Sequence, residues 1–162
     1  MESGVSALLR VCSSYGILAV VTGATDGIGK AMAFEMARKG QSIFLISRSQ
    51  EKLEATRSEL LAKYPAVEVR ILAIDFSKLD HGSRQKIAEE LKKLDVGVLV
   101  NNVGISYPYT RYYFELSDET VEQLITLNVE STTWMTRLVL PGMIERRKGA
   151  IVNVSSGKCF TS

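Results

Sequence analysis

The sequence has few of the residues that build disulfide-rich, metal-binding or membrane-spanning proteins. Among 162 residues there are only two cysteines, one histidine and three prolines. Two thiols near opposite ends of the chain make no disulfide framework, which favours a reducing compartment over a secreted scaffold. The longest apolar runs are far shorter than the roughly 20 residues that span a bilayer. The first residues also lack the apolar stretch of a secretory signal.

The sequence also lacks a large excess of either positive or negative charge. The 20 basic residues exceed the 18 acidic residues by only two. This small excess gives no reason to expect nucleic acid or an anionic membrane as a partner. Hydrophobic residues make up 46% of the chain and charged residues 23%, close to the globular average. The length therefore fits one domain with a sizeable core.

Short apolar runs alternate with longer helical patterns along the chain. The apolar residues of the short runs are consecutive, which is typical of strands covered on both faces. Strands are predicted at residues 17–22, 42–47, 67–74, 96–101 and 150–155, and helices at 28–39, 50–63, 78–93 and 118–147. This alternation predicts one doubly wound α/β domain with a parallel sheet. The last helix is expected to break near Pro141, because proline removes a donor and clashes with the preceding turn.

A glycine-rich turn follows the first predicted strand. Residues 22–30 read Thr-Gly-Ala-Thr-Asp-Gly-Ile-Gly-Lys and lead into a helix. Glycines allow a tight turn and a close phosphate, and a helix N-terminus offers free N–H groups. A triphosphatase P-loop would need glycine at Ala24 and a hydroxyl residue at Ala31, so dinucleotide binding is favoured, with an ordinary strand-to-helix turn as the alternative. The cofactor contacts predicted here are Thr22, Gly23, Thr25, Asp26, Gly27, Ile28 and Gly29.

The end of the second strand indicates which dinucleotide is bound. An acid at this position would bind the ribose of NAD, whereas an arginine accommodates the extra phosphate of NADP. The strand ends Ile46-Ser47-Arg48 and has no acid at its tip. A guanidinium can pair with phosphate through two hydrogen bonds, so NADP(H) is the predicted cofactor and Arg48 its phosphate contact. The alternative for Arg48 is a solvated loop charge.

The spacing Thr-Gly-x-x-x-Gly-x-Gly resembles the short-chain dehydrogenase/reductase family. The Asn-Asn-Val-Gly of residues 101–104 and the Ser-Ser of residues 155–156 extend the likeness over most of the chain. It implies a Rossmann-like sheet of strand order 3-2-1-4-5, truncated here before the last strands. That order would place the glycine turn beside residues 101–104 at the topological switch point. The domain is expected at residues 17–157, after an extension of residues 1–16 and before an atypical tail of residues 158–162.

Four segments are most similar to microsomal 3-ketoacyl-CoA reductases and 17β-hydroxysteroid dehydrogenases. They are residues 25–30, 45–49, 101–109 and 139–143. The resemblance implies NADPH-dependent reduction of a 3-oxoacyl-CoA to the 3-hydroxyacyl-CoA in very-long-chain fatty-acid elongation, at the endoplasmic reticulum. An acyl-CoA or a steroid ketone would be the substrate, and elongase-complex proteins possible partners. The steroid dehydrogenase reading remains an alternative.

The resemblance also implies roles for five residues outside the glycine turn. Asp75 would contact the adenine, and Asn102 and Gly104 would line the cofactor cleft. Asn128 would hold a water in a proton relay, and Ser156 would orient the substrate carbonyl. The alternatives are a capping or turn role for Asp75, a structural role for Asn102 and a locally bonded Asn128.

The chain departs from the family in one important respect. The family has a Tyr-x-x-x-Lys pair after strand five, and none of the six tyrosines here is followed by lysine four positions later. The single histidine, His81, is interpreted as capping or solvated, and neither a Gly-x-Ser-x-Gly elbow nor a zinc-ligand spacing is present. A non-catalytic nucleotide-binding or interaction fragment is therefore a further alternative. Self-association through an unpaired edge of strand five is also expected.

Overall fold

A computed structural model of the chain describes residues 18–107, 109 and 111–155. Five parallel strands form one sheet in the order β3-β2-β1-β4-β5, which confirms the predicted α/β class and strand order. The strands are β1 (Leu18–Thr22), β2 (Ser42–Ser47), β3 (Val69–Ala73), β4 (Val96–Asn101) and β5 (Ala150–Asn153). Every residue of β1 and β4 is buried, as the consecutive apolar runs predict.

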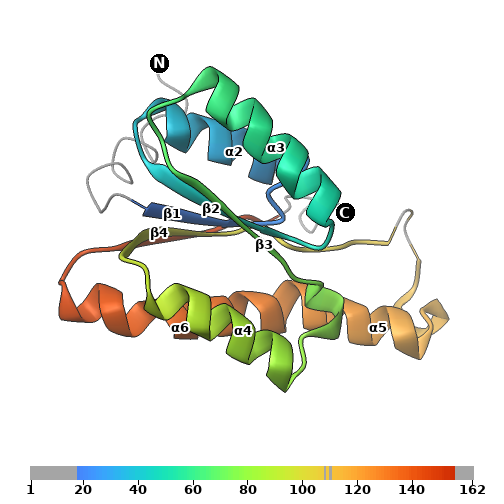
Figure 1. Cartoon of the computed structure of the whole chain (residues 1–162). Coiled ribbons are helices and arrows are strands. Elements are labelled where there is room, and N and C mark those ends of the chain that lie inside the picture. Colours follow the sequence, from blue (N-terminus) through green and yellow to red (C-terminus); the bar gives the residue numbers. More distant parts are fainter. Residues whose placement is uncertain (1–17, 108, 110, 156–162) are drawn as a thin grey trace, which may run out of the picture.

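Helices cover both faces of the sheet (Figure 1). On one face lie α2 (Gly27–Arg38) and α3 (Gln50–Lys63), and on the other α4 (His81–Lys92) and α6 (Ser131–Glu145). Successive strand residues point to opposite faces, so Val21 packs in the core under α2 and α3 while Val20 packs in the core over α4 and α6. The two cores hold the carboxyl ends of the strands at one edge.

Side-chain caps set the start of two helices, one later than predicted and one at the predicted residue, Asp118. The helix predicted over residues 78–93 begins at His81, since Asp80 Oδ1 accepts a hydrogen bond from Ser83 N at 2.8 Å. A short 3-10 turn, η1 (Phe76–Lys78), precedes it. Ser117 caps α5 (Asp118–Ile125), and acids occupy the first turn of that helix. Within the described ranges, no helix combines the length and apolarity needed to cross a membrane.

The last helical stretch is interrupted at a different place from the one that proline predicts. The expected break near Pro141 is wrong, because α6 continues through Pro141 to Glu145. Proline has no N–H to donate to the carbonyl one turn earlier, but Pro141 is exposed, so water can bond that carbonyl instead. Only one helical turn follows Pro141, which limits the cost of the lost hydrogen bond. The irregularity lies earlier, where Thr126–Glu130 form a π-helical turn, η3, between α5 and α6.

Candidate cofactor site

The glycine turn lies at the carboxyl end of β1 and begins α2. Gly23 and Gly27 have positive φ angles of 61° and 52°, a backbone conformation that favours glycine. Gly23 N donates to Ile46 O at 2.8 Å, which joins the turn to β2. Asp26 caps α2 by accepting a hydrogen bond from Gly27 N at 2.8 Å. The turn thus has a fixed shape before any ligand binds.

Thr22 and Asn102 join the ends of β1 and β4. The hydroxyl of Thr22 donates to Val100 O at 3.2 Å and accepts from Asn102 N at 3.0 Å. It also accepts from Val103 N at 3.2 Å. Asn102 Nδ2 donates to the carbonyl oxygens of Thr22 at 3.1 Å and Gly23 at 3.2 Å. These bonds place the glycine turn beside residues 101–104, and they use polar groups that the sequence assigns to the cofactor.

The inner side of the turn is closed and its outer side is open. A Cβ on Gly29 would lie 2.4 Å from both Asn102 Nδ2 and Gly23 O, so no side chain fits there. A Cβ on Gly27 would meet nothing within 4 Å. Ile28, in the first turn of α2, is 60% exposed. An open backbone at the start of a helix fits the diphosphate of a dinucleotide.

The tip of β2 lies next to the turn. Thr25 Oγ1 and Ser47 Oγ are 3.0 Å apart and share a hydrogen bond. Arg48 follows immediately and is exposed. Ser47 was not among the predicted site residues, although a hydroxyl directly before Arg48 at a strand end was a signal for it. The contact fixes the base of Arg48 beside the turn, where a guanidinium could reach a phosphate.

Asp75 follows β3 and shapes its own turn. Its Oδ1 accepts hydrogen bonds from Ser77 Oγ at 2.7 Å and Ser77 N at 3.0 Å. Chiefly the Ser77 hydroxyl, with smaller contributions from the backbone bond and the charges of Lys78 and Arg48, holds the pKa of Asp75 below its ordinary value. The carboxylate is therefore ionised at neutral pH and caps η1. Its predicted adenine contact stays a prediction.

Asn128 lies in the π-helical turn and holds the loop after β4. Its Oδ1 accepts from Ile105 N at 2.9 Å, and its Nδ2 donates to Ile105 O at 3.0 Å. A Cβ on Gly104 would lie 2.6 Å from Asn128 Oδ1, so glycine lets the loop approach this closely. The expectation of a regular helix around Asn128 is wrong. Its side chain is bonded to the loop, and its predicted role in holding a water stays a prediction.

Three consecutive hydroxyl residues support the π-helical turn. Their hydroxyls each donate to the carbonyl four residues back: Ser131 to Leu127 at 2.7 Å, Thr132 to Asn128 at 3.3 Å and Thr133 to Val129 at 2.8 Å. Bonds of this kind compete with regular helical bonds and often accompany bent helices. The three hydroxyls bond backbone carbonyls in the π-helical turn, where the regular pattern of helical hydrogen bonds is interrupted. These bonds support the turn in which Asn128 faces Ile105.

Replacing Asn128 with alanine should lower the free energy of unfolding by about 1 kcal/mol, because two solvent-exposed hydrogen bonds to Ile105 are lost. Urea unfolding followed by circular dichroism measures this. Gln123→Ala is the matched control, because it removes an exposed amide that bonds Glu119 within α5 and should change the free energy of unfolding by less than about 0.5 kcal/mol. An Asn128→Ala chain as stable as the wild type would contradict the clamp.

Asn101 positions the end of β5. Its Nδ2 donates to Asn153 Oδ1 at 2.9 Å and to Thr136 Oγ1 at 3.2 Å, which joins β4, β5 and α6. Val154 N donates to Asn101 O at 2.9 Å. The chain therefore leaves β5 at the same edge as the glycine turn. Ser156, the predicted substrate contact, lies outside the described residues.

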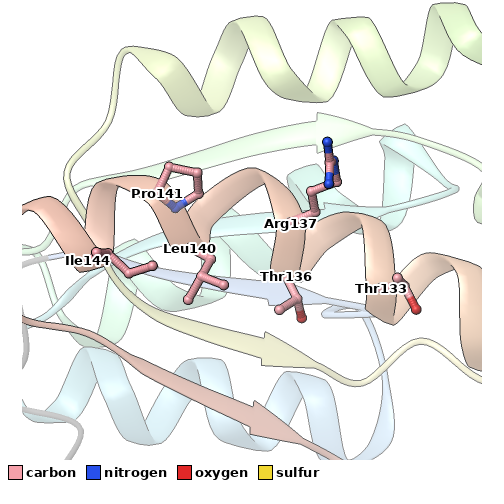
Figure 2. Close-up of a pocket in the computed structure, with 6 residues that line it drawn as sticks. All are labelled: Thr133, Thr136, Arg137, Leu140, Pro141 and Ile144. Carbon is pink, nitrogen blue, oxygen red and sulfur yellow. The ribbon is translucent and has the colours of Figure 1, made fainter.

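A separate hollow runs along α6 (Figure 2) and has a volume of about 490 Å³. Its lining residues come from one face of the helix: Thr133, Thr136, Arg137, Leu140, Pro141 and Ile144. None of them is among the predicted site residues. Its lining combines apolar side chains with Arg137 and two threonines, and it contains neither a glycine turn nor a helix N-terminus.

Comparison with known proteins agrees with this geometry. The sequence profile of the short chain dehydrogenase family matches residues 18–162. The chain is 52% identical over 143 residues to a protein from Bos taurus named very-long-chain 3-oxoacyl-CoA reductase, covering 87% of this chain and 45% of that protein. It is 49% identical over 145 residues to the human protein named inactive hydroxysteroid dehydrogenase-like protein 1, covering 90% of this chain and 43% of that protein.

Solved structures show the same architecture. A short-chain dehydrogenase from Sphingobium yanoikuyae, solved in complex with NADPH, is 29% identical. It superposes with a TM-score of 0.80 over 89% of this chain and 55% of its own. The chain thus spans about half the length of the relatives it matches. The profile match, the strand order and the glycine turn together show that the chain belongs to the short-chain dehydrogenase/reductase family.

Proposed function

We propose that this chain is the cofactor-binding portion, residues 17–157, of an NADPH-dependent oxidoreductase. The reaction proposed is the reduction of a 3-oxoacyl-CoA to the 3-hydroxyacyl-CoA in very-long-chain fatty-acid elongation, at the endoplasmic reticulum. The observation that carries the proposal is the closed glycine turn, locked against Asn102 and adjoining Arg48 at the tip of β2. The relative from Bos taurus named very-long-chain 3-oxoacyl-CoA reductase, at 52% identity, supports the substrate class.

Seven of the eleven predicted cofactor contacts would touch the cofactor in this proposal, and the other four, Thr22, Gly23, Gly29 and Asn102, would hold the shape of the turn. The outer backbone of the glycine turn, with Thr25, Asp26, Gly27 and Ile28, would hold the diphosphate. Arg48 would bind the extra phosphate, and Asp75 would contact the adenine. Gly104 is held by Asn128 where the nicotinamide side of the cleft would begin. NADPH, when bound, supplies the hydride for the reduction.

The proposed catalytic residues orient the substrate and water. Ser156 would donate a hydrogen bond to the substrate carbonyl, and Asn128 would hold a water through its backbone carbonyl. Asn128 O already accepts from Thr132 Oγ1 at 3.3 Å, so this oxygen would have to serve both groups. A carbonyl oxygen has two lone pairs and can do so.

A second candidate function is non-catalytic nucleotide binding. The human relative named inactive hydroxysteroid dehydrogenase-like protein 1, at 49% identity, favours it, as does the lack of a Tyr-x-x-x-Lys pair among these 162 residues. A steroid ketone is the alternative substrate, because a relative from Gallus gallus named hydroxysteroid dehydrogenase-like protein 1 matches at 50% identity, close to the 52% of the relative from Bos taurus. Among the described residues, β5 pairs only with β4, so its other edge could pair with elongase-complex proteins or a second copy.

Replacing Arg48 with aspartate tests the cofactor proposal. The expected result is a loss of NADPH affinity of about tenfold or more with a shift of preference toward NADH, because phosphate attraction becomes repulsion. Isothermal titration calorimetry with both cofactors measures it. Arg38→Asp is the matched control, since Arg38 is an exposed arginine in the last turn of α2. Equal effects of the two changes would contradict a phosphate contact at Arg48.

A further inference from the structure

An exposed group of aromatic side chains lies beyond the carboxyl edge of the sheet. Its members are Tyr109, Tyr112, Tyr113 and Phe114, here called the aromatic tip, and each is between 58% and 82% exposed. They belong to the segment between β4 and α5, which Figure 1 shows extending past the sheet. Aromatic side chains usually bury large areas, so four exposed ones in six residues indicate a surface that meets something apolar.

The aromatic tip has a defined local structure. The rings of Tyr112 and Phe114 stack with centroids 5.5 Å apart and an angle of 6° between their planes. The Arg111 guanidinium lies 4.6 Å from the centre of the Tyr109 ring. Glu115 accepts a hydrogen bond from Tyr112 N at 2.9 Å and closes the short turn η2 (Tyr113–Glu115). The rings are therefore preorganised on a projecting turn.

We infer that the aromatic tip inserts into the headgroup region of a phosphatidylcholine membrane. Tyrosine and phenylalanine gather at membrane interfaces, where tyrosine keeps its hydroxyl in water and its ring in the apolar boundary. Aromatic faces also attract the quaternary ammonium of choline. Membrane binding at the aromatic tip requires neither the cofactor nor the proposed reaction.

The charges around the aromatic tip select among possible partners. Residues 109–122 contain four acids, Glu115, Asp118, Glu119 and Glu122, and one arginine. These acids would repel nucleic acid and anionic lipids, whereas they attract choline. In a two-fold contact between identical copies, the same acids would face one another. The charge pattern therefore favours a zwitterionic lipid surface over a second copy.

A bound acyl chain fits this surface less well than a membrane does. A hollow of about 390 Å³ adjoins Tyr113 and Phe114, but Asp118 and Glu122 also line it. Sites for apolar ligands are concave and mostly apolar, and they bury most of the ligand. Projecting rings with hydroxyl groups meet a flat interface more readily.

Binding of the 162-residue chain to phosphatidylcholine vesicles tests the inference by flotation. The expected result is wild-type partitioning that changes little between about 0.05 M and 0.5 M salt, because it does not depend on anionic lipid. The double variant Tyr113→Ser/Phe114→Ser should partition at least about tenfold more weakly. Leu140→Ser/Ile144→Ser on α6 is the matched control for exposed apolar area and should bind as the wild type does.

A fluorescence measurement reports the position of the aromatic tip directly. Trp134 is the only tryptophan, and its ring packs 4.3 Å from the Arg84 guanidinium, so phenylalanine can replace it conservatively. Phe114→Trp in the Trp134→Phe background should shift its emission to shorter wavelength on adding phosphatidylcholine vesicles. No vesicle binding by the wild type, an equal loss in the α6 control, a requirement for phosphatidylserine, or an unshifted emission would each overturn the inference.

Discussion

Reduction of a long-chain 3-oxoacyl-CoA by the 162-residue chain should be at least about 10²-fold slower than reduction by a family enzyme with a Tyr-x-x-x-Lys pair. Hydride addition to a carbonyl leaves an alkoxide that must take a proton as it forms. A positioned general acid is typically worth about 10²–10⁴-fold. No tyrosine here is followed by lysine four positions later, so that acid and its lysine are not among these residues.

Neither Tyr107 nor Ser156 is a suitable general acid in place of the pair. An unperturbed tyrosine has a pKa near 10 and serves poorly at neutral pH unless a cation lowers it. Tyr107 precedes Arg111 by four positions, but it lies in the loop after β4. Ser156 could hydrogen-bond a carbonyl, but its hydroxyl is too weak an acid to protonate an alkoxide efficiently.

NADPH oxidation followed at 340 nm with a long-chain 3-oxoacyl-CoA measures this turnover. The control is the same assay without the chain, which gives the uncatalysed rate of NADPH oxidation. Robust turnover by the wild-type chain that disappears in Ser156→Ala would contradict the prediction. It would mean that another residue of this chain supplies the proton.

Replacing Gly29 with alanine should abolish measurable NADPH binding and destabilise the fold by about 1–3 kcal/mol. The added methyl would lie 2.4 Å from Gly23 O, a backbone atom, and 2.4 Å from Asn102 Nδ2. Asn102 cannot move freely, because its amide bonds the carbonyls of Thr22 and Gly23. The turn would have to open, and with it the junction of β1 and β4.

Gly82→Ala is the matched control for this change. Gly82 lies in the first turn of α4, where an added Cβ would only meet Asp80 Oδ1 at 3.7 Å, an ordinary contact. Alanine there should leave cofactor binding unchanged and keep or slightly raise stability, because alanine favours helices. Calorimetric titration and urea unfolding of both variants give the comparison. Normal NADPH binding by Gly29→Ala would show that the turn is not a close-packed cradle.

The strands were predictable most precisely where they are buried on both faces, as β4 is and β2 nearly is. Residues 42–47 and 96–101 were predicted with the observed bounds, since their consecutive apolar residues leave little ambiguity. The strands predicted at residues 67–74 and 150–155 were one or two residues too long at their ends. Apolar residues continue there beyond the backbone that pairs with the neighbouring strand. The glycine turn was located correctly because glycine at positive φ has few substitutes.

The features that sequence missed depend on contacts between distant segments. The hydroxyl residues 131–133 were the one nearby sign of an irregular turn, but the partner of the Asn128 side chain, Ile105, lies 23 positions away. Pro141 was a misleading signal, since the cost of proline depends on whether its helix face meets water. The contact of Ser47 with the glycine turn could not be predicted from local sequence, because it depends on Thr25 lying 3.0 Å away at the sheet edge. Local patterns therefore predicted the elements, and the packing between them decided the details of the site.

NADPH is expected to bind at the carboxyl edge of this sheet. Isothermal titration of NADPH and NADH into the wild-type chain tests it most directly. The predicted result is NADPH binding at a single site, at least about tenfold tighter than NADH, because Arg48 adds a charged hydrogen bond to the extra phosphate. Tighter binding of NADH, or a folded chain that binds neither cofactor, would contradict it.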